Sequence, residues 1–194
     1  VGFNCGIRPP LRIGDNAIVV GDGLVGHWAA QTLAWRGARV LLVGRHAYRL
    51  RHFSGKPFQH VHNLADDPDW IGVANSLFPD KAAVAVDTVG AAPVMEGFFH
   101  VLHRFGHAVS AGFYGTADEV ALQPLRYGEL SLDLVSGWQP ERMVETIRLI
   151  AGGYLETLSL ITHHFPARKA AEAWALIENK SEPVLGVILD WENA

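Results

Sequence analysis

The sequence predicts an α/β protein built on a doubly wound parallel sheet, a three-layer αβα Rossmann fold, with a C-terminal helix-strand appendage. Two observations predict this class. Short apolar runs alternate with segments whose apolar residues recur at helical spacing, as crossover connections between parallel strands require. A glycine-rich turn at 21–26, with the letters GDGLVG, also lies directly between the first apolar run, 17–20, and the first long helical segment.

The alternation is regular over the first part of the chain. Ala17 to Val20 is the first strand, and the helix at 24–36 ends at Gly37 because glycine readily adopts the conformation that closes a helix. Arg39 to Val43 is almost entirely apolar, as expected for a strand buried on both faces of a parallel sheet. The remaining elements of this part are a helix at 46–53, a strand at 59–62, a helix at 68–78, a strand at 82–86, a helix at 91–104 and a strand at 107–112.

The alternation is looser after Tyr114. We expect a loop or hairpin arm at 118–125, a sixth strand at 131–135, and a helix at 140–150 with proline in its first turn. The appendage is predicted as a strand, a helix and a last strand. They cover 158–162, 166–178 and 185–189.

The glycine turn predicts a dinucleotide-binding site, because it follows a strand and opens a helix. Gly21 allows the sharp turn off the strand, Gly23 lets a diphosphate approach the backbone, and Gly26 lets the helix pack on the strand. The helix start, at Leu24 and Val25, offers unpaired N–H groups to the phosphates. The alternative is a tight strand-to-helix turn that binds nothing.

Gly44 and Arg45 stand where a dinucleotide fold selects its cofactor. An Asp or Glu about twenty residues past the first glycine would bind the ribose hydroxyls and repel a phosphate. This chain has Gly44, Arg45 and His46 there, with Arg49 one helical turn further. Glycine leaves room and a guanidinium can hold a 2′-phosphate through paired hydrogen bonds, so we expect NADP to be preferred over NAD. Alternatively, Arg45 is an ordinary solvated residue. The missing carboxylate also argues against S-adenosylmethionine-dependent methyl transfer.

Composition excludes several function classes. The chain has 194 residues, a net charge of -4 and one cysteine, so nucleic-acid binding or attachment to an anionic membrane has no electrostatic support. No apolar segment is long enough to span a membrane and no signal peptide is visible, so we expect a cytoplasmic protein. Cys5 by itself can form neither an internal disulfide nor a cysteine-based zinc site.

The ten histidines raise the question of a metal site. They include the sets His60 and His62, His100, His103 and His107, and His163 and His164. No carboxylate or cysteine joins these sets, so solvated or hydrogen-bonded histidines are expected, and no metal ligand is assigned. Sequence signatures of other chemistries are missing as well, namely a Tyr-x-x-x-Lys pair, a Gly-x-Ser-x-Gly elbow and a Walker lysine. We therefore assign no catalytic residue.

Several runs resemble the coenzyme domain of medium-chain dehydrogenase/reductases, the zinc alcohol dehydrogenase superfamily. They are 14–26 (GDNAIVVGDGLVG), 87–90 (DTVG), 111–115 (AGFYG), and in the tail 161–166 (ITHHFP), 170–174 (AAEAW) and 187–191 (VILDW). The resemblance begins near Arg12 and covers nearly all the rest of the chain. With 137–140 (GWQP) and the Leu-Asp-Trp ending, the chain resembles most the members related to bacteriochlorophyllide a dehydrogenase.

The resemblance implies hydride transfer between NADP(H) or NAD(H) and an alcohol or carbonyl substrate. It implies that 87–90 line the cofactor path and that 112–114 and 137–138 approach the nicotinamide, as expected at the carboxyl ends of strands. For Tyr114 and Trp138 the alternative is core or dimer packing. The predicted cofactor-binding residues are Gly21, Asp22, Gly23, Leu24, Val25, Gly44, Arg45, His46, Arg49, Asp87, Thr88, Val89, Gly90, Gly112, Phe113, Tyr114, Gly137 and Trp138.

The expected domain organisation follows from the same resemblance. Residues 1–15 form a lead segment left from an absent N-terminal catalytic domain, which would carry any zinc ligands; 16–157 form the dinucleotide-binding domain, and 158–194 a return segment. The chain alone is therefore expected to be inactive. A competing hypothesis is a non-catalytic nucleotide-binding module. The strand at 131–135 lies near a sheet edge that would pair across a two-fold axis, which favours a homodimer.

Overall fold

The computed structural model describes residues 1–116, 119–137 and 139–192. The chain forms two compact units, Val1–Leu155 and Glu156–Ala194, which are described separately. Among the helices described, none has the length and apolar character needed to cross a membrane.

The first unit contains a six-stranded sheet in the order β3-β2-β1-β4-β5-β6. The strands are β1 (Asn16–Val20), β2 (Arg39–Gly44), β3 (Gln59–Asn63), β4 (Ala82–Asp87), β5 (Leu102–Ser110) and β6 (Ser131–Leu134). Every neighbouring pair is parallel. The strand order reverses between β1 and β4, and the carboxyl ends of strands on either side of such a reversal form the crevice in which open α/β sheets bind ligands.

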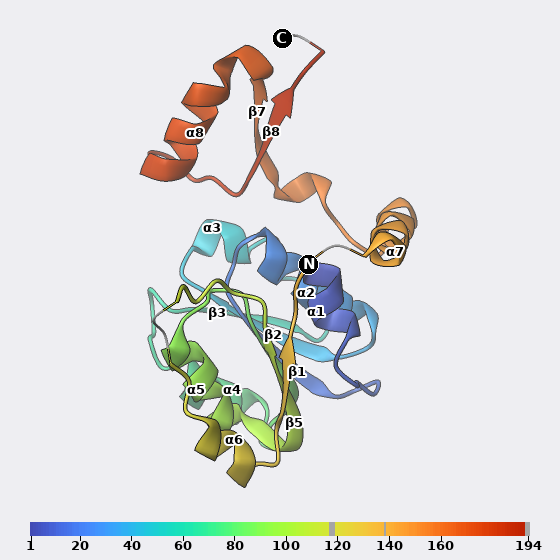
Figure 1. Cartoon of the computed structure of the whole chain (residues 1–194), viewed down its shortest axis with the longest axis vertical. Coiled ribbons are helices and arrows are strands. Elements are labelled where there is room, and N and C mark those ends of the chain that lie inside the picture. Colours follow the sequence, from blue (N-terminus) through green and yellow to red (C-terminus); the bar gives the residue numbers. More distant parts are fainter. Residues whose placement is uncertain (117–118, 138, 193–194) are drawn as a thin grey trace. The chain divides into compact units, whose positions relative to one another are not determined.

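Helices cover both faces of this sheet (Figure 1). The helices described in this unit are α1 (Gly2–Ile7), α2 (Leu24–Trp35), α3 (Ala47–Leu50), α4 (Trp70–Leu77), α5 (Ala92–Val101), α6 (Leu122–Tyr127) and α7 (Pro140–Ala151). One core cluster joins β-strand residues to Leu33 of α2 and Leu50 of α3, and a second joins the other sheet face to Met95 and Phe98 of α5. The predicted doubly wound, three-layer αβα fold is confirmed.

The boundary between α5 and β5 differs from the prediction. The helix expected to reach residue 104 ends at Val101, and β5 begins at Leu102. Leu102 already pairs with Ala82 of β4, and the register then shifts before Val84 pairs with His107. Phe105 adopts the left-handed region at φ 67° within this irregular stretch. Strand pairing therefore overrides the helical spacing of the sequence at this point.

Two helices of the first unit were not predicted. The segment 118–125, expected as a loop, contains the start of α6, whose Leu125 is buried in the core; residues 117–118 lie outside the described ranges. The predicted lead segment contains α1, which packs closely on α2. A Cβ on Gly2 would lie 2.6 Å from the Trp28 Cβ, and one on Gly6 would lie 2.6 Å from the Thr32 Cβ. Glycine at these two positions permits the close approach.

The second unit is smaller. It contains the 3-10 turns η1 (Leu158–Leu160) and η2 (Ala167–Lys169), the strands β7 (Ile161–Pro166) and β8 (Gly186–Asp190), and α8 (Ala170–Asn179). β7 and β8 form a parallel pair, and Thr162 Oγ1 accepts a hydrogen bond from Leu185 N at 3.0 Å. The strand expected at 158–162 starts later because 158–160 form a 3-10 turn. The helix expected from 166 starts at Ala170, also after a 3-10 turn.

Candidate functional site

The glycine turn that joins β1 to α2 requires glycine at two positions, Gly21 because of its backbone conformation and Gly26 because of its packing. Gly21 has φ 119° and donates its N–H to Val43 O at 2.8 Å, which ties the turn to β2. A Cβ on Gly26 would run into the carbonyl oxygen of Gly21 and lie 3.1 Å from Thr88 Oγ1. The helix therefore begins directly against the end of the strand, as predicted.

Gly23 has a different environment. It is the N-cap residue of α2, and no heavy atom lies within 4 Å of the position that its Cβ would occupy. The backbone of the turn is thus bare on this side. The amides of the first turn of α2, at Leu24 and Val25, have no intrahelical acceptor. An open backbone surface at a helix N-terminus is what a diphosphate requires, so these residues fit a dinucleotide.

The segment after β4 packs against the turn from the other side. Thr88 Oγ1 donates to Val20 O at 3.0 Å. Asp87 is fully buried, and its carboxylate accepts hydrogen bonds from Val89 N at 2.7 Å and from Gly90 N at 3.2 Å. These bonds hold 87–90 in a tight turn at the carboxyl end of β4. Because β1 and β4 are neighbours, this turn and the glycine turn lie side by side at the carboxyl end of the sheet.

The end of β5 meets this turn closely. Gly90 has φ 83°, and a Cβ on Gly112 would collide with the backbone of Gly90. Phe113 is 88% exposed, whereas Tyr114 is half-buried and its hydroxyl donates to the carboxylate of Asp87. The structure therefore brings 87–90 and 112–114 together after the carboxyl ends of β4 and β5. It gives Tyr114 a packing and hydrogen-bonding role at Asp87, and contact of Tyr114 with a nicotinamide stays a prediction.

Gly137 lies elsewhere in the first unit. It has φ 41° and lines a pocket between α1 and α7 together with Phe3, Asn4 and Met143. Asn4 Nδ2 donates to Ser136 O at 3.4 Å, which connects α1 to the segment after β6. The predicted Trp138 lies outside the described residues.

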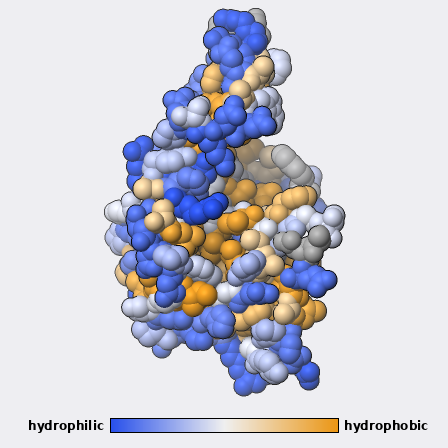
Figure 2. Space-filling model, turned by 90° about the vertical axis from the view of Figure 1, so that its left-hand side faces the viewer, coloured by the Kyte–Doolittle hydropathy of each residue, from blue (hydrophilic) through white to orange (hydrophobic). Residues whose placement is uncertain are grey.

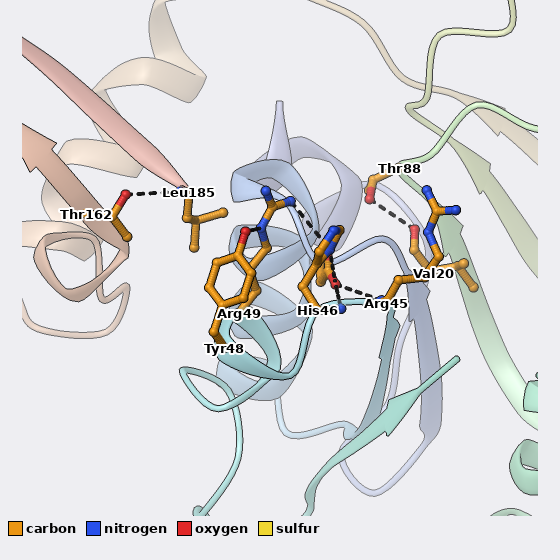
Figure 3. A network of polar contacts seen from close by, with 9 residues as sticks. Val20, Arg45, His46, Tyr48, Arg49, Thr88, Thr162 and Leu185 are labelled. Carbon is orange, nitrogen blue, oxygen red and sulfur yellow. Dashed lines mark hydrogen bonds and ion pairs between the residues drawn. The ribbon is translucent and has the colours of Figure 1, made fainter. Parts of the chain in front are cut away.

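The carboxylate of Asp22 organises the predicted selectivity position after β2. Asp22 Oδ2 accepts hydrogen bonds from the backbone N–H groups of Arg45 and His46, both at 2.8 Å. His46 Nδ1 lies 3.0 Å from the same carboxylate, and Arg49 Nη1 lies 3.5 Å from Asp22 Oδ1. The turn between β2 and α3 is thereby held by a side chain of the glycine turn (Figure 3).

The space beside Gly44 is filled by this carboxylate. A Cβ on Gly44 would collide with the Cβ, Cγ and Oδ2 atoms of Asp22. Glycine at this position therefore makes room for Asp22, a role that the sequence prediction did not anticipate. The sequence shows Asp22 between two glycines, but it does not show that Asp22 lies next to Gly44. That proximity comes from the pairing of β1 with β2.

Burial and hydrogen bonding act on Asp22 in opposite directions. Its side chain is only 7% exposed, and burial by itself would raise the pKa of the carboxyl. The hydrogen bonds from His46 and from the two backbone amides outweigh burial and hold the pKa of Asp22 below its ordinary value. Asp22 is therefore an ionised, almost fully enclosed carboxylate.

The two arginines differ in their surroundings. Besides its ion pair with Asp22, Arg49 donates from Nε to the hydroxyl of Tyr48 at 2.9 Å, and its guanidinium lies 5.3 Å from the centre of the Tyr48 ring. Its side chain is 14% exposed. Arg45 is exposed, and Figure 3 shows that the side chains of Arg45 and Arg49 extend in different directions. The structure thus separates two residues that the sequence prediction treated as a pair.

Two further groups near this region are buried. His27, in the first turn of α2, has no exposed surface, and neither ring nitrogen has a hydrogen-bond partner among the described residues. Burial lowers the pKa of His27 to about 4, helped by the neighbouring His52. Cys5 in α1 is also fully buried, and burial raises the pKa of its thiol to about 11.

These groups do not fit a metal. Within the ranges that the structure describes, no three His, Cys, Asp or Glu side chains come together to hold an ion. A catalytic zinc needs three protein ligands, and a cysteine ligand must be a thiolate. Cys5 is not part of such a group among the described residues.

This chain is similar in sequence to a known dehydrogenase. In sequence, the chain is 31% identical over 175 residues to the 2-desacetyl-2-hydroxyethyl bacteriochlorophyllide A dehydrogenase of Cereibacter sphaeroides, a match that covers 90% of this chain and 51% of that protein. The chain therefore spans about half the length of this relative.

Solved structures show the same fold. An alcohol dehydrogenase of Thermus sp. ATN1 superposes with a TM-score of 0.82 at 21% identity, over 97% of this chain and 54% of that chain. An alcohol dehydrogenase of Escherichia coli CFT073, determined in complex with NADH, gives a TM-score of 0.81 at 21% identity, over 98% of this chain and 57% of that chain. A family model described as zinc-binding dehydrogenase matches residues 25–152, more than half of the sequence, and the chain belongs to this family.

Proposed function

We propose that this chain is the NADP(H)-binding domain of an alcohol dehydrogenase-like oxidoreductase. In that enzyme, hydride passes between the cofactor and an alcohol or carbonyl substrate. Bound nicotinamide would supply the hydride chemistry, and the residues of this chain would bind and orient it. Family membership and the similarity to a bacteriochlorophyllide dehydrogenase support the reaction class.

The observation that carries this proposal is the contrast between Gly23 and Gly26. A side chain at residue 26 would collide with the Gly21 carbonyl, so that the helix must begin against the strand, whereas a side chain at residue 23 would point into open space. Gly23 has φ -80°, a conformation that any residue can adopt, so its backbone conformation does not require glycine. A turn that bound nothing could therefore carry a side chain at this position. The diphosphate would bind there, on the amides of Leu24 and Val25.

The preference for NADP over NAD rests on the β2–α3 turn. Gly44 carries no carboxylate to accept ribose hydroxyls, and Asp22 is enclosed by its own partners. Arg45 is exposed beside this turn and supplies a guanidinium for the 2′-phosphate. Asp87, Thr88, Val89 and Gly90 would line the path toward the nicotinamide, with Gly112 and Phe113 beyond them.

The substrate pocket and any zinc ligands would lie outside this chain, so that the 194 residues by themselves would show no turnover. A second candidate is a non-catalytic module that binds the cofactor as a sensor. The two candidates differ in one expectation. The sensor would show no turnover even when the zinc-containing segment of a related enzyme is added.

Titration of the chain with NADPH and NADH tests the proposal, with the quenching of its six tryptophans as the signal. Saturable binding of both cofactors, tighter for NADPH, is expected. If neither NADPH nor NADH bound at millimolar concentration, the proposed function would be contradicted. Adding the zinc-containing segment of a relative and measuring alcohol oxidation would distinguish the enzyme domain from the sensor.

Two expectations about the setting of the protein belong to the same proposal. We place it in the cytoplasm, where its buried, unpaired Cys5 would stay reduced. We also propose a homodimer through the sheet edge at β6, where Leu132 is 39% and Leu134 is 67% exposed. Sedimentation equilibrium at micromolar concentration would refute the dimer if only monomer were found.

A further inference from the structure

On the basis of the proposed function, we further propose that Asp22 is a positioning residue for the 2′-phosphate of NADP. Its carboxylate joins the diphosphate-binding turn to the turn after β2, restrains Arg49, and leaves Arg45 as the guanidinium that meets the phosphate. Asp22 belongs to the glycine turn, 22 residues before Gly44 in the chain, and its carboxylate reaches the predicted selectivity position at Gly44 and Arg45.

The Asp22 carboxylate is oriented toward the backbone of the turn after β2. In the usual arrangement an acidic residue at the end of the second strand accepts hydrogen bonds from the ribose. Here the carboxylate fills the space beside Gly44, but its Oδ2 atom accepts from two successive backbone amides, those of Arg45 and His46, at 2.8 Å each. With 7% of its side chain exposed, Asp22 binds the turn of the protein rather than a ligand.

Positively charged groups surround that carboxylate unequally. Arg49 Nη1 lies 3.5 Å from Asp22 Oδ1, and the Tyr48 hydroxyl accepts from Arg49 Nε at 2.9 Å. His46 also faces the carboxylate, through Nδ1 at 3.0 Å. The positive charge of Arg49 is therefore balanced by Asp22, whereas the exposed Arg45 adds a positive charge that no described acidic side chain pairs with.

Asp22 also connects the glycine turn to the turn after β2. Asp22 lies between Gly21 and Gly23, so a diphosphate bound at Gly23 and a 2′-phosphate bound at Arg45 would be held by one continuous set of contacts. Gly44 belongs to the same arrangement, because any side chain at this position would displace the Asp22 carboxylate. The geometry thus gives Asp22 an indirect role, in which it fixes the backbone at Arg45.

Two nucleotide fragments test this role directly. 2′,5′-ADP and 5′-AMP differ only in the 2′-phosphate, so the ratio of their dissociation constants reports the site at Arg45. In Asp22→Asn the amide oxygen can still accept both backbone N–H groups, and the ratio is expected to stay within about threefold of the wild-type value. In Asp22→Ala both acceptor atoms are lost, and affinity for 2′,5′-ADP is expected to fall by at least about tenfold, with a smaller loss for 5′-AMP.

The direction in which Asp22→Ala changes the affinity for 2′,5′-ADP distinguishes a positioning role from electrostatic repulsion of the phosphate. If Asp22 acted only as a negative charge near the phosphate, its removal would tighten 2′,5′-ADP binding, and this result would overturn the inference. Tighter binding of 5′-AMP than of 2′,5′-ADP by the wild type would also overturn it, because Asp22 would then accept ribose hydroxyls. If the wild type bound neither fragment nor either dinucleotide, the proposed function itself would be refuted, and the inference with it.

A matched pair of arginine variants keeps the inference testable should Asp22→Ala fail to fold. Arg45→Gln is expected to abolish the preference for 2′,5′-ADP, whereas Arg49→Gln, which removes a partner of Asp22, is expected to reduce it only in part. The reverse ranking of the two variants would overturn the assignment of Arg45. Thermal unfolding of each variant shows that the comparison is made between folded proteins.

Discussion

Gly26, in the first turn of α2, packs so tightly against the carbonyl oxygen of Gly21, in the turn that follows β1, that no side chain fits between them. This contact sets where α2 starts relative to the end of β1. Gly23, between them in sequence, has no neighbour on its Cβ side. The two glycines therefore have different roles, Gly26 in packing and Gly23 in leaving the backbone open, and alanine variants can distinguish them.

The first prediction compares Gly23→Ala with Gly26→Ala. Gly23→Ala is expected to leave the melting temperature nearly unchanged and to weaken NADPH binding by at least about tenfold, because its methyl group occupies the diphosphate approach. Gly26→Ala is expected to destabilise the protein by about 2 kcal/mol or more through overpacking. Chemical denaturation and fluorescence titration measure the two effects. Unchanged NADPH affinity in a folded Gly23→Ala would contradict the assignment of the site.

The second prediction concerns the hydrogen bond from Tyr114 to the buried carboxylate of Asp87. Tyr114→Phe leaves Asp87 with fewer donors, so the free energy of unfolding is expected to fall by about 1.5–3 kcal/mol, the range for bonds to charged groups. Tyr127→Phe is the control, because Tyr127 is 78% exposed and its change is expected to stay within about 0.5 kcal/mol. Equal effects of the two variants on urea denaturation would refute the structural role of Tyr114.

The third prediction is a pH dependence of stability that arises from His27. Burial lowers the pKa of His27 from 6.5 to about 4, so the unfolded chain binds more protons than the folded one between these values. The stability of the protein therefore rises as pH increases through this window, by on the order of 3 kcal/mol for the whole shift at about 1.4 kcal/mol per pKa unit. Below about 4 both states are protonated at this group and the dependence ends.

Replacement of His27 by leucine tests this. The free energy of unfolding is measured between about pH 5 and pH 7, above the range in which most carboxylates titrate. In His27→Leu the free energy of unfolding is expected to depend less on pH than in the wild type. The variant is also expected to be more stable than the wild type near pH 5, because it removes a buried polar ring without hydrogen-bond partners. An unchanged slope would show that another group causes the dependence.

The fourth prediction concerns Cys5. Its thiol is fully buried and burial raises its pKa to about 11, so almost no thiolate exists at neutral pH. A disulfide-exchange reagent is expected to react with it only as the protein unfolds, and stoichiometrically in denaturant. Rapid modification of the native protein, without loss of structure by circular dichroism, would contradict the packing of α1.

Much of the fold could be predicted because its signals are local. The buried runs of β1, β2 and β4, the helix that follows the glycine turn, and the proline at the start of α7 depend on short stretches of sequence. The errors occurred where distant contacts decide the conformation. Leu102 becomes a strand residue because Ala82 lies opposite it, and α6 buries Leu125 against the core.

The same division applies to the candidate site. The sequence by itself determined the glycine turn, the positions at the ends of β4 and β5, and the absence of a carboxylate at residue 44, because each depends on residue types at fixed spacing. Only the tertiary structure decided that Asp22 fills the space beside Gly44 and that Arg45 and Arg49 have different partners. The reason is that the pairing of β1 with β2 brings together two turns that are distant along the chain, and no local pattern records what then meets across them.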